Sequence, residues 1–145
     1  MYETILIPTD GSDTAREAAE HAIDLAADSG ATVHVLYVIE SKPVFTVVGF
    51  SGLEDDTAEE EYRAFAEERL AEIKELAEER GVEAKTVIKR GTPHTKIVEY
   101  ADDIGADTIV MGAHGYDWDG IEQRVLGSTT ERVNRNSLIP VVTVR

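Results

Sequence analysis

Short apolar runs alternate with amphipathic segments along the chain. The apolar runs are rich in β-branched residues and predict buried strands at 4–8, 32–39, 84–89, 108–111 and 140–144. Apolar residues recur at helical spacing in the segments between them, which predicts helices from Ser12 or Asp13 to Gly30, over Thr57–Arg80, from Pro93 to Gly105 and over Ser128–Asn136. Strands that alternate with helices indicate one doubly wound α/β domain over residues 1–145, a five-stranded parallel sheet with helices on both faces.

Residues 41–56 interrupt this pattern. Their apolar residues show no clear period and are broken by Pro43, Gly49 and Gly52, which indicates a long loop that serves as a lid or a partner surface. The helix expected after it is amphipathic. Its many glutamates form a solvated face, and its apolar face is expected to comprise Tyr62, Phe65, Leu70, Ile73 and Ala77.

Ligands of doubly wound sheets bind beyond the carboxyl ends of the strands, where the strand order reverses. The candidate loops are therefore residues 9–13, after the first strand, and residues 112–127, after the fourth. The second loop contains Gly112 and Gly115 and ends in Gly127-Ser128, just before a helix. Glycine lets the backbone approach an anion, and the free N–H groups of a helix N-terminus attract phosphate. The alternative is that these glycines only form turns and that Ser128 only caps the helix.

Three further residues are candidates for the same site. Asp10 can accept hydrogen bonds from ribose hydroxyls, can help to hold a metal ion, or can simply stabilise a helix N-terminus. Val38 is placed either to contact an adenine ring or to fill the core. His114 can donate a hydrogen bond beside phosphates or act as a general acid. The sequence contains neither a Ser/His/Asp arrangement nor the G-x-x-x-x-G-K-[ST] pattern, so no lysine completes a Walker-type site.

The net charge of the chain limits the classes of partner that it can bind. Its 29 acidic and 14 basic residues give a net charge of −15, which disfavours nucleic acid and anionic lipid. The absence of cysteine excludes disulfides and thiolate metal sites, and no apolar run could span a membrane. We therefore expect a cytoplasmic protein. A dispersed acidic surface with few lysines is also typical of a protein from a high-salt cytoplasm, so a halophilic source is expected, and together with the resemblance given below a halophilic archaeon; the alternative is an ordinary acidic, soluble protein.

Four segments together resemble the universal stress protein (UspA-like) family. They are ILIPTDGS at 5–12, IVMGAHG at 109–115, LGSTTERV at 126–133 and IPVVTV at 139–144, and the likeness extends from end to end. ATP-binding members carry the pattern G-x2-G-x9-G-[ST]. Gly112, Gly115, Gly127 and Ser128 fit it, but eleven residues rather than nine separate Gly115 from Gly127.

This resemblance implies an adenine nucleotide alpha hydrolase-like fold with strand order 3-2-1-4-5, and binding of ATP or another adenine nucleotide, with Mg²⁺ or Mn²⁺ as a companion. It also implies a homodimer through the C-terminal strand, residues 140–145, in a stress-response or regulatory role. The lengthened, acidic loop leaves two alternatives open: an interaction module without nucleotide, and a slow metal-assisted ATP hydrolase. The binding residues that the resemblance implies are Pro8, Thr9 and Asp10 for adenosine, Val38 for adenine, and Met111, Gly112, His114, Gly115, Gly127, Ser128 and Thr129 for ribose and phosphate.

Overall fold

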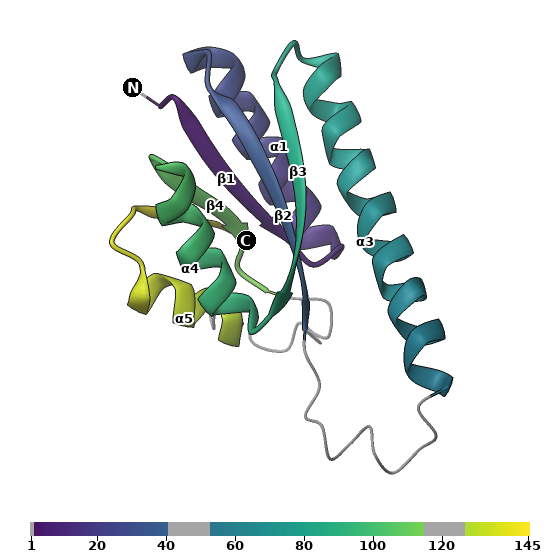
Figure 1. Ribbon diagram of the computed structural model, residues 1–145. Coiled ribbons are helices and arrows are strands. Elements are labelled where there is room, and N and C mark those ends of the chain that lie inside the picture. Colours follow the sequence, from purple (N-terminus) through teal and green to yellow (C-terminus); the bar gives the residue numbers. More distant parts are fainter. Residues whose placement is uncertain (1, 41–52, 115–126) are drawn as a thin grey trace.

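The computed structural model describes residues 2–40, 53–114 and 127–145. Strands and helices alternate along these residues, as the apolar pattern predicts (Figure 1). In chain order the elements are β1 (Thr4–Thr9), α1 (Asp13–Ser29), β2 (Thr32–Glu40), α3 (Leu53–Glu79), β3 (Ala84–Gly91), α4 (Pro93–Ile104), β4 (Thr108–Gly112), α5 (Ser128–Asn136) and β5 (Val141–Val144).

The five strands form one sheet with the order β3-β2-β1-β4-β5, and all neighbours are parallel. Both the α/β class and the strand order are therefore confirmed. The order reverses at β1, which pairs with β2 on one side and with β4 on the other. The carboxyl ends of β1 and β4 consequently meet in the middle of the sheet edge, where doubly wound folds bind their ligands.

The core has two layers, one on each face of the sheet. Ile5 and Ile7 of β1 pack with residues of α1 and α3, whereas Leu6 between them packs with residues of α4 and α5. This division follows from the alternation of side chains along a strand. β1 is buried on both faces, which explains its continuous apolar run.

Helix α3 differs from its expected form at its N-terminal end. It begins at Leu53, four residues before the expected start at Thr57. Tyr62 was expected on the apolar face but is 45% exposed. The buried stripe starts instead at Ala66, because the first turns of α3 reach past the ends of the strands (Figure 1). The remainder of the expected loop, 41–52, lies outside the described residues.

None of the described helices is both long enough and apolar enough to cross a membrane.

Candidate functional site

Three side-chain hydrogen bonds shape the loop between β1 and α1. Thr9 Oγ1 accepts from the N–H of Gly11 at 3.1 Å, and Asp10 Oδ1 accepts from the N–H of Ser12 at 2.9 Å. Ser12 Oγ caps α1 by accepting from the N–H of Ala15 at 3.1 Å. Gly11 has φ +85°, a conformation that other residues rarely adopt. The turn keeps Asp10 exposed at the carboxyl end of β1, the central strand.

The two ends of the β4–α5 loop are bonded to each other. The N–H of Gly127 donates to the carbonyl oxygen of Ala113 at 2.7 Å. Thr130, in the first turn of α5, donates its hydroxyl to the carbonyl oxygen of Gly112 at 2.8 Å. These bonds place the start of α5 directly beside the end of β4, so the glycines on either side of the loop lie together.

Among the described residues, no side chain caps the N-terminus of α5. Gly127 is its N-cap and offers no side-chain hydrogen bond, unlike Ser12 at the start of α1. The first intrahelical bond runs from the N–H of Glu131 to the carbonyl of Gly127, so the N–H groups of the first turn have no acceptor within the helix. Ser128 is exposed and Thr129 is half-buried. Such a terminus is suited to an anion.

Gly112 is needed for packing as well as for any approach of an anion. A Cβ atom at this position would lie 2.9 Å from Thr14 Cγ2, 3.0 Å from the backbone carbon of Thr14 and 3.1 Å from the nitrogen of Ala15. The first turn of α1 therefore presses directly against the end of β4. This contact brings the β1–α1 loop and the β4–α5 loop together at the switch point.

The structure brings the expected adenosine-side residues to one edge of the sheet. Pro8 and Thr9 are buried at the end of β1, and Asp10 follows them. Val38 is half-buried and lies one residue past Tyr37, the register partner of Thr9.

The expected ribose and phosphate residues come from β4, α5 and the loop between them. Met111 is buried near the end of β4, and half-buried His114 follows that strand. Gly127, Ser128 and Thr129 begin α5, as described above. Gly115 and the eleven residues before Gly127 lie outside the described residues, so the effect of the longer spacing stays a prediction.

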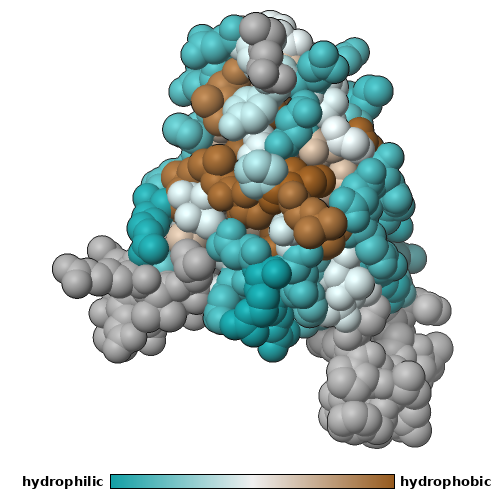
Figure 2. Space-filling view, turned by 90° about the vertical axis from the view of Figure 1, so that its left-hand side faces the viewer, coloured by the Kyte–Doolittle hydropathy of each residue, from teal (hydrophilic) through white to brown (hydrophobic). Residues whose placement is uncertain are grey.

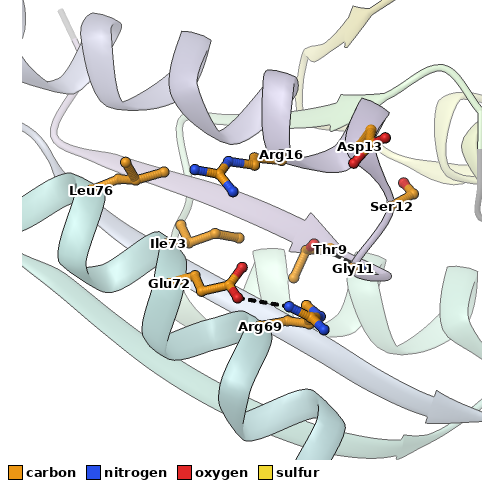
Figure 3. A pocket seen from close by; sticks show the side chains of 9 residues that line it. All are labelled: Thr9, Gly11, Ser12, Asp13, Arg16, Arg69, Glu72, Ile73 and Leu76. Atoms are coloured by element: carbon orange, nitrogen blue, oxygen red, sulfur yellow. Dashed lines mark hydrogen bonds and ion pairs between the residues drawn. The ribbon is translucent and has the colours of Figure 1, made fainter.

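A pocket of about 270 Å³ lies beside the β1–α1 loop, between α1 and α3 (Figure 3). Ile73 and Leu76 line it and belong to the core layer of α1 and α3, whereas Val38 and Met111 belong to the opposite layer. The pocket therefore does not coincide with the expected nucleotide site. Its full lining is Thr9, Gly11, Ser12, Asp13, Arg16, Arg69, Glu72, Ile73 and Leu76.

Two residues that shape the site were missing from the sequence-based set. Thr130 is 4% exposed, and its hydroxyl joins α5 to β4. Gly11 has no room for a side chain, since a Cβ atom would lie 2.9 Å from the ring of Phe65. A weak signal for Thr130 was present: it is three residues before Val133, the buried apolar residue of α5, and therefore on the same face of the helix.

The described residues contain no group of three or more carboxylate or histidine side chains placed to hold a metal ion. The geometry is thus that of a doubly wound α/β domain with an open helix N-terminus at its switch point, the class of fold that binds nucleotides in this place. The family model of the universal stress proteins matches residues 1–145. The chain belongs to the universal stress protein family.

Individual relatives agree with this assignment. The universal stress protein MJ0531 of Methanocaldococcus jannaschii is 40% identical over 147 residues, which cover 100% of this chain and 83% of that protein. The solved structure of MJ0577, from the same organism, has a TM-score of 0.81 at 36% identity and covers 99% of this chain and 96% of that one. A solved universal stress protein in complex with cAMP has a TM-score of 0.69 at 26% identity, with 99% of this chain and 97% of that chain covered.

Proposed function

We propose that this universal stress protein binds an adenine nucleotide, ATP above all, at the carboxyl edge of β1 and β4. The observation that carries the proposal is the open N-terminus of α5, held against the end of β4 by the bond between Gly127 and Ala113. Backbone N–H groups with a favourable helix dipole can hold phosphates on a protein whose net charge of −15 otherwise repels them.

The adenosine half of the ligand fits the adjoining surface. Val38 and Met111 belong to one apolar layer and offer contacts to a base. Asp10 lies beside them at the end of β1 and can accept hydrogen bonds from ribose hydroxyls. A relative at 26% identity was solved with cAMP, an adenine nucleotide, which supports the choice of base. Mg²⁺ or Mn²⁺ would be held mainly by the phosphates themselves, and Asp10 is the carboxylate of the expected site that could assist.

We further propose that the chain forms a homodimer through β5. This strand lies at one edge of the sheet, and Val141, Val142 and Val144 are each half-buried within a single chain. Figure 2 looks onto the side of the molecule where α5 lies and shows hydrophobic residues gathered in the middle of that face. Leu138, just before β5, is 96% exposed. An edge strand with apolar side chains favours pairing with a second copy.

The nucleotide proposal is tested by thermal unfolding with 1 mM ATP and MgCl₂, because a ligand that binds only the folded state raises Tm. The decisive variant is Ser128→Glu. Its carboxylate favours the N-terminus of α5 and so preserves the helix, but it repels phosphate. Asn134→Glu adds the same charge at an exposed position further along α5 and serves as the control.

We expect ATP to raise the Tm of the wild type and of Asn134→Glu but not that of Ser128→Glu. Equal shifts in all three proteins would place the nucleotide elsewhere. No shift in the wild type would overturn the proposal and would favour a dimeric interaction module without nucleotide, for which the exposed edge of β5 is the supporting feature. Analysis of the nucleotide recovered after incubation then separates binding of intact ATP from slow hydrolysis.

A further inference from the structure

The hydroxyl of Thr130, in the first turn of α5, makes its hydrogen bond outside its own helix. A threonine within a helix commonly bonds to the carbonyl three or four residues earlier in its own helix. Thr130 instead donates to Gly112, eighteen residues back, on the last residue of β4. It is 4% exposed, so water does not replace this bond readily. The hydroxyl therefore connects two elements rather than serving its own helix.

Several contacts hold Gly112 and Ala113, at the end of β4, in place. Gly112 accepts from Thr130, and its Cα lies tightly against Thr14 of α1. Ala113 accepts from the N–H of Gly127 and donates its own N–H to Val144. The end of β4 is thus a rigid reference point, and Thr130 and Gly127 are the two residues that tie the first turn of α5 to it.

We propose that Thr130 is a positioning residue for phosphate binding, an inference that rests on the proposed nucleotide function. Its hydroxyl sets the distance and the direction of the first-turn N–H groups of α5 relative to β4. Ser128 and Thr129 remain on the accessible side of the same turn, where a phosphate would lie. Preorganised donors bind an anion more tightly than donors that must be ordered on binding. Thr130 contributes to affinity without touching the ligand.

The test compares Thr130→Val with Thr130→Ser. Valine keeps the shape of threonine and removes the hydroxyl, whereas serine keeps the hydroxyl. The affinities for ATP and for adenosine are measured by calorimetry, because adenosine lacks the phosphates that α5 would hold. We expect Thr130→Val to weaken the binding of ATP at least about fivefold and the binding of adenosine less than about twofold. The reason is that the substitution removes the hydrogen bond to the buried carbonyl of Gly112, at the phosphate end of the site. Thr130→Ser should bind ATP almost as tightly as the wild type.

A purely structural role gives a different result. Thr130→Val would then lower Tm but leave the ratio of ATP to adenosine affinity unchanged, which would overturn the inference. Should Thr130→Val fail to fold, Gly127→Pro removes the other bond to the end of β4 at a φ of −63°, which proline adopts readily. It should show the same selective loss of ATP. A wild type that binds adenosine but shows no added affinity for ATP refutes the phosphate site itself, and a wild type that binds neither refutes the nucleotide function.

Discussion

The N–H of Ala113 donates to the carbonyl oxygen of Val144 at 2.9 Å. Ala113 follows Gly112 in the glycine-containing loop, and Val144 is the last residue of β5. The carbonyl of Ala113 accepts in turn from Gly127 at the start of α5. One buried residue therefore joins the strand proposed for dimerisation to the helix proposed for phosphate binding.

A substitution can selectively block hydrogen bonding at the outer edge of β5. Pro140 and Val144 accept hydrogen bonds from β4, so by alternation the backbone of Thr143 faces the open edge. Thr143→Pro should therefore leave the pairing with β4 in place and remove a donor from the edge. We expect the protein to shift from dimer to monomer in sedimentation equilibrium, with little change in circular dichroism.

Leu138→Ser is the control for this shift, because Leu138 is 96% exposed and precedes the strand. If pairing is carried by the strand backbone, this variant stays dimeric or weakens only slightly. A dimer that survives Thr143→Pro but not Leu138→Ser would locate the interface on the apolar surface beside the strand.

Gly112→Ala should destabilise the fold even without ligand. Its Cβ would lie 2.9 Å from Thr14 Cγ2 and 3.0 Å from backbone, and overpacking of this kind costs about 1–3 kcal/mol. The expected result is a decrease in Tm of about 2–4 °C for each kcal/mol lost. Gly112 does not have a positive φ, so this loss reflects crowding alone; Gly105→Ala shows the opposite case, a positive φ of +64° with nothing within 4 Å of the new Cβ. An unchanged Tm in Gly112→Ala would contradict the tight contact between α1 and β4.

The fold was predictable because β1 and β4 are buried on both faces, and such strands show in the sequence as continuous apolar runs. The start of α3 was harder to place. Its first turns reach past the ends of the strands (Figure 1), and an apolar period marks only the part of a helix that packs on the sheet. Tyr62 lies four residues before buried Ala66, so the helical spacing places it on the same face, yet it is 45% exposed.

The candidate site was predictable only where motif residues act through local turns. Asp10 and Gly127 could be proposed as site residues because they follow a strand and precede a helix, respectively. Thr130 could not, because its importance comes from a contact with Gly112 across the loop, and sequence spacing contains no record of that distance. Gly112 was predicted as a phosphate contact, and the structure adds a packing reason for a glycine there that involves α1.

His34 should make stability depend on pH. Its Nδ1 atom lies 3.2 Å from the hydroxyl of Tyr100, and burial, followed by the charge of Lys85, lowers its pKa below the usual value, with Glu83 opposing. The folded state therefore binds the proton less readily than the unfolded state. This contribution to stability is complete above the unfolded pKa of about 6.5 and is lost as the pH falls toward the folded pKa.

His34→Gln checks this dependence, because glutamine can keep a hydrogen bond to Tyr100 and does not titrate. The Tm of the wild type should fall further than that of His34→Gln between pH 7.5 and pH 5.5. The many carboxylates are common to both proteins, so their contribution cancels when the two changes in Tm are compared. If Tm changes with pH equally in both proteins, His34 does not contribute to the pH dependence of stability.

Salt should stabilise this protein through its acidic surface. Glu67, Glu68, Glu75, Glu78 and Glu79 are exposed on α3, and the chain as a whole carries a net charge of −15. Repulsion among such charges disfavours the compact state and is screened as the Debye length falls from about 10 Å at 0.1 M salt to about 3 Å at 1 M. We expect Tm to rise between 0.1 M and 2 M KCl.

A variant with these five glutamates changed to glutamine should be more stable than the wild type at 0.1 M KCl, and its Tm should rise less when salt is added. If the two proteins gain equally, the salt effect comes from burial of apolar surface rather than from charge, and the acidic surface would no longer indicate adaptation to high salt.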